Sequence, residues 1–449
     1  WEATLGLDPG QVGVHSDFYA LGGNSLLGIR LLARVRAAVA EGDDATNTTH
    51  IPLRVLLEHP TVEGLCTWMT ANTTTSHLLR PPPPLILPCP QRAAAQTANL
   101  PFFTAPLSYN MEQMLVLWEQ DPDSTAYNMP MGMELPAGVS VGQVREVIAW
   151  LVERHEALRT RFVRASGAAP PMQEVVGVGA YELPFAVVED KVAMRKESKK
   201  PFDLYTGPLA RFVVGAKDGL SEETTAQYLL VAMHHSIGDG WSCGVLQQEL
   251  QQRLTFDNPT PQPLPPTPLQ NADYSVWQRE WLEGSGELAR QLAFWRRELA
   301  DAPLVLDLPT DRPRPKVQTT RGGSVAFALD AGVAAGVAET ARRCGATGFM
   351  VCLAAWHALL ARYSRAGEGV DSSGVVTVGT PYAGRDQAET HGIVGYLVNP
   401  VAISADFAGG VVGTEGFLAL VREVRGASLG AFEHGAAPFP RVVEEVSGV

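Results

Sequence analysis

The chain has 449 residues, of which 45% are hydrophobic and 18% charged, as in a globular protein of two or three domains. Its formal net charge of −13 argues against a nucleic-acid binder, because contacts with phosphates require a basic face. Five scattered cysteines without C-x-x-C spacing, and the lack of a leader-like or membrane-length apolar stretch, predict a cytoplasmic protein that has no disulfide framework and contacts no membrane.

Residues 1–79 show helical patterns and are predicted to form a small all-α unit. The stretch NSLLGIRLLARVRAAV repeats apolar residues at i, i+4 and i+8, which indicates an amphipathic helix with Asn24 or Ser25 as its N-cap. Four consecutive prolines follow within residues 80–101, a composition typical of an extended spacer. A domain boundary is therefore expected there. The chain begins in what reads as the last turn of a helix, so this unit is expected to be truncated at its N-terminus.

From residue 102 onward helical and strand patterns alternate, which predicts an α/β region in two parts, residues 102–270 and 271–449. In the first part the apolar stretch YLLVAM runs straight into His234 and His235. Neighbouring residues of a strand face opposite ways, so one ring is expected to reach a cavity while the other packs into the structure.

The histidine pair is the main candidate for chemistry. Histidine has the unperturbed pKa nearest to neutrality, so a ring facing a cavity can accept a proton or a hydrogen bond from a reacting amine. A metal site would need a third ligand at a suitable spacing, and none is visible in the sequence. In an isolated pair two packed rings are the commoner outcome, so the residues by themselves leave a purely structural role open.

The stretch from His234 to Gly240 spells H-H-x-x-x-D-G, which resembles the signature of nonribosomal peptide synthetase condensation domains, relatives of chloramphenicol acetyltransferase. Four further stretches resemble motifs of that family in the same order: RHEALRTRF, ADYSVWQ, FWRRELADAPLVLDLPTDRPRP and VGYLVNPV. The resemblance spans about residue 102 to the end. It implies a two-lobed α/β domain of the acetyltransferase type, with residues 102–270 as the N-lobe and 271–449 as an incomplete C-lobe.

A second resemblance lies in DFYALGGNSLLGIRLLARVR, which is similar to a peptidyl carrier protein, whose serine receives 4′-phosphopantetheine. Ser25 is the matching position, and Gly22 and Gly23 let the backbone turn before it. Free N–H groups and the dipole at the start of a helix favour a phosphodiester. For GGNSL alone a simple N-cap would be preferred, but beside a condensation-like domain we expect covalent 4′-phosphopantetheine on Ser25.

Together the two resemblances imply nonribosomal peptide synthesis. An acyl or peptidyl donor would be held on Ser25 as a thioester, and the amine of an acceptor on a second carrier would attack it to form an amide. Tethering makes the encounter intramolecular, so a weak docking surface suffices. The implied partners are a downstream acceptor carrier, an upstream adenylation domain and a phosphopantetheinyl transferase.

The resemblance also assigns roles to the residues of the histidine motif. His235 is expected nearest the reaction, where it removes the proton of the amine or orients the amine by a hydrogen bond. His234 is expected to be structural. Gly240 is expected to give the loop room and to offer a backbone N–H, with an oxyanion role left open.

Asp239 could be read as the third member of a catalytic triad, but the resemblance favours a structural carboxylate that points away from the cavity and pairs with an arginine. Arg159 is the preferred partner and Arg161 the next. Asn399, in VGYLVNPV, is a candidate positioning residue of the channel. The sequence departs from the family at SYNMEQML and at Pro400, which leaves donor preference and channel shape open.

Three rival functions remain. Epimerisation domains share H-H-x-x-x-D-G but need a second acid/base glutamate, and the comparable stretch PYAGRD has a proline in its place. Heterocyclisation domains carry D-x-x-x-x-D instead of the histidine motif and fit less well. A non-catalytic domain that only docks carriers is the third, although the retained histidines and Asp239 argue against it. Condensation is therefore the preferred interpretation.

Overall fold

A computed structural model describes residues 1–448 apart from 24, 41–50, 52, 73–82, 99, 165–168, 217, 218, 220, 255–266, 268, 304, 317–321, 365–373 and 408–412. By its internal contacts the chain divides into two units. The first unit comprises Trp1–Pro84, Glu287–Ala388 and Asn399–Val449, and the second comprises Leu85–Gly286 and Glu389–Val398. Two segments of the predicted C-lobe, residues 271–286 and 389–398, thus belong with the N-lobe residues.

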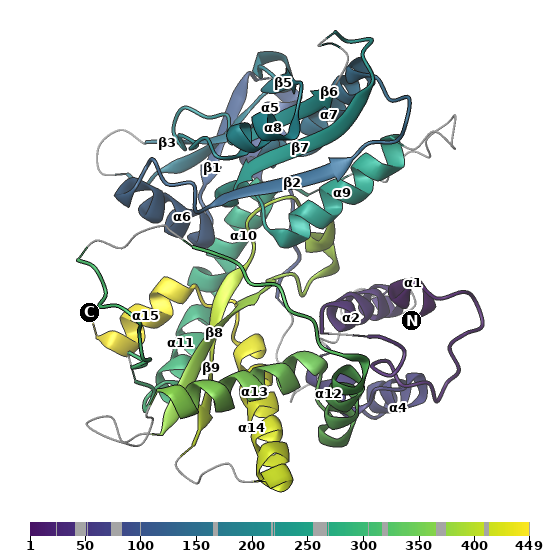
Figure 1. Ribbon diagram of the computed structural model, residues 1–449, viewed down its shortest axis with the longest axis vertical. Coiled ribbons are helices and arrows are strands. Elements are labelled where there is room, and N and C mark those ends of the chain that lie inside the picture. The colour runs from purple at the N-terminus through teal and green to yellow at the C-terminus, as the bar shows by residue number, and fades with distance from the viewer. Residues whose placement is uncertain are drawn as a thin grey trace. The chain divides into compact units, whose positions relative to one another are not determined.

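The N-terminal part of the first unit is a small helical bundle, as the sequence predicts (Figure 1). Its helices are α1 (Glu2–Leu5), α2 (Ser25–Ala40), α3 (Leu53–Glu58) and α4 (Val62–Asn72). Apolar side chains from α2, α3 and α4 and the intervening loops enclose a core of Phe18, Leu31, Leu32, Ile51, Val55, Leu56 and Leu65. The apolar face that the sequence pattern predicts on α2 therefore builds this core.

The C-terminal part of the first unit packs helices on a two-stranded antiparallel ladder. Strands β8 (Val375–Tyr382) and β9 (Asn399–Asp406) pair from Val375 opposite Asp406 to Tyr382 opposite Asn399. The helices are α11 (Glu287–Glu298), α12 (Ala331–Cys344), α13 (Gly348–Tyr363), α14 (Gly413–Glu433) and α15 (Phe439–Ser447). Their apolar faces share one core that includes Trp295, Met350, Ile403 and Val421.

The second unit contains two sheets. The first has three antiparallel strands in the order β1-β4-β3: β1 (Phe102–Pro106), β4 (Met172–Val176) and β3 (Thr160–Val163). The second has four strands in the order β2-β7-β6-β5: β2 (Asn128–Glu134), β7 (Ala226–His234), β6 (Ala210–Ala216) and β5 (Phe185–Val188). Three short 3-10 turns belong to this unit: η1 (Glu156–Arg159), η2 (Val178–Ala180) and η3 (His235–Ile237). A fourth turn, η4 (Ala388–Gly392), crosses the boundary between the units.

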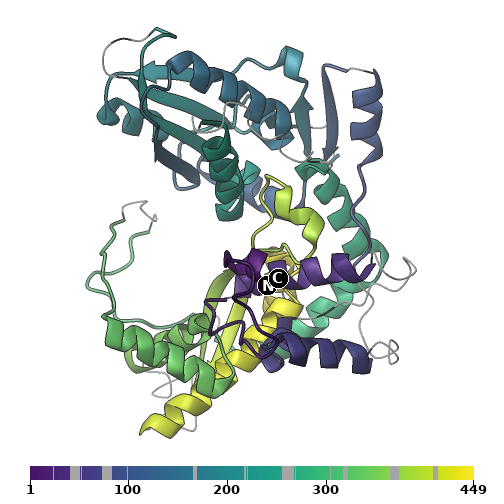
Figure 2. The same cartoon turned by 90° about the vertical axis from the view of Figure 1, so that its right-hand side faces the viewer.

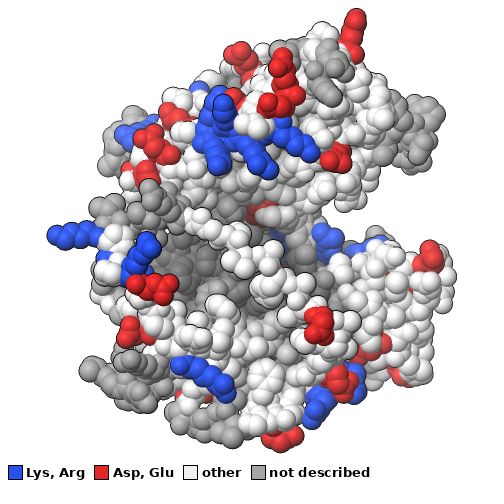
Figure 3. Space-filling view, in the orientation of Figure 1, with Lys and Arg blue, Asp and Glu red and all other residues white. Residues whose placement is uncertain are grey.

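Helices cover both faces of the four-stranded sheet (Figures 1 and 2). The unit has helices α5 (Pro90–Ala98), α6 (Tyr109–Gln120), α7 (Val141–Arg154), α8 (Lys191–Ser198), α9 (Gly240–Leu254) and α10 (Asn271–Gly284). Residues of α7 and α9 share a core with one face of β7, and Met194 of α8 packs on the other face. Strand β7 is therefore buried on both faces, which explains why its sequence is an unbroken apolar run. Helix α8 is basic on its outer side, and Lys and Arg side chains gather there (Figure 3).

The second half of the predicted 80–101 linker is folded, which the proline-rich composition does not predict. Residues 80–82 lie outside the described residues, but Pro90–Ala98 forms helix α5. Its Arg92 is 7% exposed and bonds to the carboxylates of Glu156, at 3.1 Å, and Asp273, at 2.9 Å. The backbone N–H of Cys89 donates to Asp273 at 2.7 Å. This stretch is thus fastened into the second unit by buried, charge-assisted hydrogen bonds.

We expect the Arg92→Ala variant to lower the free energy of unfolding of the protein by about 3–5 kcal/mol, because removing one partner leaves two buried carboxylates without their counter-charge. Urea unfolding followed by circular dichroism measures the change. The matched control is Arg54→Ala, which removes an exposed pair with Glu58 and should change stability by about 0.5 kcal/mol or less. Equal effects of the two substitutions would show that the Arg92 cluster does not hold α5.

Within the described ranges no single helix has the length and apolarity needed to cross a membrane, and α12 and α13, bent by 101°, meet these criteria only as a pair.

Candidate functional site

The histidine pair stands where β7 ends, held on both sides by neighbouring backbone. His234 is the last residue of the strand, and its N–H donates to the carbonyl of Leu209 at 2.9 Å. His235 opens η3, and its N–H donates to the carbonyl of Tyr127 at 2.8 Å. The strand thus delivers both rings to one end of the four-stranded sheet, where their positions are set by β2 and β6 on either side.

The ring of His234 is packed into the structure. It is 3% exposed, and its Nδ1 accepts a hydrogen bond from the backbone N–H of Ser236 at 3.1 Å. The rings of Tyr127 and Phe202 flank it, with centroids 6.4 and 6.2 Å away. Burial, followed by the neighbouring His235, lowers the pKa of His234 to about 4. His234 is therefore a neutral ring that supports the loop.

The lowered pKa of His234 predicts how stability changes with pH. The pKa falls from 6.5 to about 4 on folding, so the unfolded chain takes up this proton at a higher pH than the folded chain. The stability contributed by His234 is complete above about pH 6.5 and is lost as the pH falls towards about 4. Between about pH 7.5 and about pH 5.5 we expect the free energy of unfolding to fall by about 1.4 kcal/mol more in the wild type than in His234→Asn. Equal losses in urea unfolding of the two proteins would contradict the assignment.

His235, unlike its neighbour, has ring nitrogens without partners. The side chain is half-buried, and its ring lies edge-to-face on Tyr396 with centroids 4.8 Å apart. Nδ1 is enclosed yet bonds to no residue that the structure describes. Nε2 is not enclosed in this way and likewise forms no hydrogen bond within the described part of the chain. This imidazole is free to bond to a reactant.

Asp239 is fully buried and fastens two pieces of backbone. Its Oδ1 accepts from the N–H and from the hydroxyl of Ser242, both at 2.8 Å, which caps the start of α9. Its Oδ2 accepts from the N–H of Leu397 at 3.2 Å, and the Ser242 hydroxyl contacts Gly395 as well. The carboxylate thus ties the histidine loop to the segment 389–398 and does not act on the Nδ1 of His235.

The predicted pairing of Asp239 with Arg159 or Arg161 is wrong. The Nε of Arg159 donates to the carbonyl of Val152 at 3.3 Å, and its Nη1 bonds to the carbonyl of Val176. Arg161 lies in β3 directly opposite Glu174 of β4 and pairs with it at 2.6 Å. Both arginines are therefore used by the three-stranded sheet, and burial lowers the pKa of Arg159.

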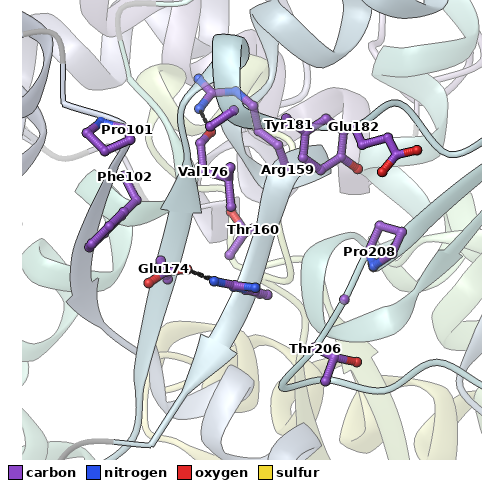
Figure 4. Close-up of a pocket in the computed structure, with 13 residues that line it drawn as sticks. Pro101, Phe102, Arg159, Thr160, Glu174, Val176, Tyr181, Glu182, Thr206 and Pro208 are labelled. Atoms are coloured by element: carbon purple, nitrogen blue, oxygen red, sulfur yellow. Dashed lines mark hydrogen bonds and ion pairs between the residues drawn. The ribbon is translucent and has the colours of Figure 1, made fainter.

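Arg159 and Arg161 line a separate pocket of about 420 Å³ (Figure 4). Its wall on the sheet side includes Thr160 and Glu174, and Tyr181 and Glu182 stand beside Arg159. The Tyr181 hydroxyl donates to the carbonyl of Leu158 at 2.9 Å. Neither His234 nor His235 lines this pocket, so the two arginines belong to another part of the unit.

The structure gives Gly240 and Asn399 different settings from one another. Gly240 is the exposed first residue of α9, and a Cβ added there would meet no atom within 4 Å. Packing among the described residues therefore does not require a glycine at this position. Asn399 lies in the first unit, where its Nδ2 donates to the carbonyls of Gly435 and Ala437 at 2.9 and 2.6 Å and its Oδ1 accepts from Phe439 at 3.1 Å. The whole amide of Asn399 is thus used to hold the turn between α14 and α15.

The start of α2 fits a phosphodiester-linked group. The 16-residue helix begins at Ser25, although Asn24 and the side chain of Ser25 lie outside the described residues. Gly22 has a φ of 94°, and a Cβ on Gly23 would lie 2.4 Å from the ring of Phe18. The two glycines are therefore needed to bring the chain into this helix. The N–H groups of its first turn have no helical acceptor and favour an attached phosphate.

Sequence reasoning missed Tyr396 and Ser242. Tyr396 lies within the VGYLVNPV stretch, and the signal for Ser242 was its position three residues after Asp239, the spacing of a helix cap. Among the described residues no three His, Cys, Asp or Glu side chains stand close enough together to hold a metal ion.

The chain is similar to known proteins in family and in sequence. The condensation domain family matches residues 104–447, and the phosphopantetheine attachment site family matches residues 1–69. The linear gramicidin synthase of Brevibacillus parabrevis is, in one of its subunits, 33% identical over 99% of this chain and 5% of that protein. Tyrocidine synthase 2 of the same organism is 31% identical over 100% of this chain and 11% of that protein. The chain thus spans a small part of the length of these relatives.

Solved structures share the fold. The X-domain from teicoplanin biosynthesis superposes with a TM-score of 0.64 at 25% identity, over 76% of this chain and 73% of that one. A four-domain nonribosomal peptide synthetase bound to AMP and glycine superposes with a TM-score of 0.63 at 21% identity, over 77% of this chain and 25% of that one. The predicted two-part α/β architecture is confirmed by these likenesses, and the predicted helical carrier by its family match.

Proposed function

Because the chain belongs to the condensation-domain family of nonribosomal peptide synthetases and has a phosphopantetheine attachment domain in front of it, we propose that it forms amide bonds in peptide synthesis. The donor is an acyl or peptidyl group linked to Ser25, and the acceptor is the amine of an aminoacyl group on a second carrier. The main support is the ring of His235, which stands at the end of β7 with neither nitrogen bonded to a described residue.

Ser25 is the proposed attachment residue. When bound there, 4′-phosphopantetheine supplies a thiol that holds the donor as a thioester. The first turn of α2 stabilises the phosphodiester through its free N–H groups, and Gly22 and Gly23 shape the backbone that precedes it. The remaining chemistry is that of the residues around His235.

His235 is proposed to hold the attacking amine through Nε2. An imidazole that acts as the base of a triad has its Nδ1–H held by a carboxylate, which fixes the tautomer and stabilises the charged ring. Here the Asp239 carboxylate is occupied by Ser242 and Leu397, and Nδ1 of His235 has no acceptor among the described residues. This arrangement supports orientation of the amine rather than strong-base catalysis.

The partners follow from the same proposal. A phosphopantetheinyl transferase would modify Ser25, an upstream adenylation domain would load the donor, and a downstream carrier would bring the acceptor. The relatives are synthases of which the chain covers a small part, so these partners, the substrates and the cytoplasmic location belong to the proposal.

One experiment separates the proposed reaction from its rivals. Ser25 is loaded with a panel of aminoacyl donors, mixed in D₂O with an aminoacyl acceptor carrier, and both carriers are analysed by mass spectrometry. We expect a dipeptidyl product on the acceptor whose donor α-carbon keeps its original hydrogen. Deuterium at that carbon without amide formation would establish epimerisation instead. Neither product, with carrier binding retained, would identify a docking domain.

A further inference from the structure

We propose that Tyr396 is a second substrate-contacting residue of the site. Its phenol O–H donates a hydrogen bond to the carbonyl oxygen of the donor acyl group while His235 holds the amine. This inference rests on the proposed function and adds to it a group that acts on the other reacting atom.

The first support is the position of the ring. Tyr396 belongs to the segment Glu389–Val398, which is part of the same unit as His235. The two rings meet edge-to-face, with centroids 4.8 Å apart and an interplanar angle of 69°. A group that can reach one of these side chains is therefore within reach of the other.

The second support is that the hydroxyl has no partner. Tyr396 is 6% exposed, and a tyrosine buried to this degree normally bonds through its hydroxyl. Within the described part of the chain nothing accepts from or donates to this hydroxyl. Nδ1 of the adjoining His235 is unpartnered as well. Two neighbouring polar side chains thus leave hydrogen-bonding capacity unused at the same place, as expected where a substrate supplies the partners.

The third support is that the backbone around Tyr396 is held on both sides. On one side the Ser242 hydroxyl lies 3.0 Å from the carbonyl oxygen and 3.1 Å from the nitrogen of Gly395. On the other side Asp239 accepts from the N–H of Leu397 at 3.2 Å. A Cβ on Gly395 would lie 2.2 Å from the Oδ1 of Asn271, so this backbone leaves no room for a larger residue. Groups fixed in this way are suited to aim a hydrogen bond at one atom.

The protonation of Tyr396 decides the direction of the hydrogen bond. Burial, with smaller contributions from Tyr127 and Asp239, raises the pKa of Tyr396 to about 12. At neutral pH the phenol keeps its proton, so it acts as a donor and not as a base. When the amine attacks, negative charge develops on the carbonyl oxygen, and a fixed neutral donor stabilises that charge. The division of labour is therefore His235 on the nitrogen and Tyr396 on the oxygen.

This geometry also gives Asp239 a function. Asp239 holds Leu397 and Ser242 through its two carboxylate oxygens, and these hold the backbone on either side of Tyr396. Asp239 is thus a positioning residue that acts through the backbone of the tyrosine segment. Its place in the H-H-x-x-x-D-G motif then reflects the need to set His235 and Tyr396 against each other.

The test is the Tyr396→Phe variant, which removes the hydroxyl and keeps the ring against His235. In single-turnover assays with Ser25 loaded we expect the rate of amide formation to fall about 10²-fold, as on loss of one oxyanion donor. Loading of Ser25, the KM for the acceptor carrier and the urea midpoint of unfolding should stay at wild-type values. The matched control is Tyr228→Phe, a tyrosine that packs on the α8 side of the sheet and should leave the rate unchanged.

The outcomes separate this inference from the proposed function. A wild-type rate in Tyr396→Phe, together with a slow His235→Ala, would overturn the role of Tyr396 and leave the proposed reaction standing. Wild-type rates in both variants would overturn the proposed function itself. If Tyr396→Phe lost stability and the lower rate came with a higher KM for the acceptor, the hydroxyl would be structural and the inference would be wrong.

Discussion

In the His235→Ala variant amide formation is expected to slow by about 10²- to 10⁴-fold, the range associated with loss of a positioned acid/base group. The reason is that His235 is the ring of the motif whose Nε2 is free, whereas His234 is enclosed and its Nδ1 accepts from Ser236. The measurement is a single-turnover assay with saturating acceptor carrier, so that the chemical step is observed directly.

The matched control for His235→Ala is His15→Ala. His15 lies on the surface of the carrier, where its Nδ1 is 2.8 Å from Glu63 and its side chain is 76% exposed. This variant should keep the wild-type rate. A His235→Ala protein as fast as His15→Ala would rule out a catalytic part for the imidazole.

The Ser25→Ala variant is expected to lose modification completely. A phosphopantetheinyl transferase needs a hydroxyl to form the phosphodiester, and Ser25 is the hydroxyl residue that stands at the first position of α2, after the Gly22–Gly23 turn. Intact-protein mass spectrometry before and after treatment with the transferase and coenzyme A measures the outcome.

A serine elsewhere in the same bundle provides the control for Ser25→Ala. The hydroxyl of Ser16 accepts from the N–H of Gly13 at 3.0 Å and stabilises a turn before the core residue Phe18. Ser16→Ala should be modified as fully as the wild type. A mass increase that persists in Ser25→Ala would assign the attachment to another residue.

The sequence predicted those parts of the fold that depend on local patterns. The apolar run before His234 indicated a buried strand, and it is β7, covered on both faces. The i, i+4, i+8 pattern after Ser25 indicated a helix, and it is α2. In both cases the repeat of apolar residues matches the period of the element, which is a property of the segment itself.

Features that depend on partners distant in sequence could not be read in the same way. Arg92 lies in a stretch that resembles a spacer, and its buried partners Glu156 and Asp273 are 64 and 181 residues away. Arg159 was placed on Asp239 because both belong to motifs of one family, yet its guanidinium reaches the carbonyl of Val176 in β4. Charge type alone does not say which of several carboxylates or carbonyls an arginine will meet.

The candidate site shows the same division. His235 and Asp239 were identified because their motif is contiguous, and the roles of the two residues followed from the resemblance. Tyr396 is 161 residues further along and meets His235 only through the fold, so nothing in its local sequence marks it. The hydrogen bonds of Ser242 and Asp239 to the backbone of the 389–398 segment bring the two together.

The most direct test of the account follows the acyl group from one carrier to the other. Ser25 is loaded with an isotope-labelled donor, the acceptor carrier is added, and the label on each carrier peptide is quantified over one turnover. The account predicts that label leaves the Ser25 peptide at the same rate as it appears in an amide on the acceptor. Label that stays on Ser25 while unlabelled amide accumulates, or that is released to water without amide, would contradict it.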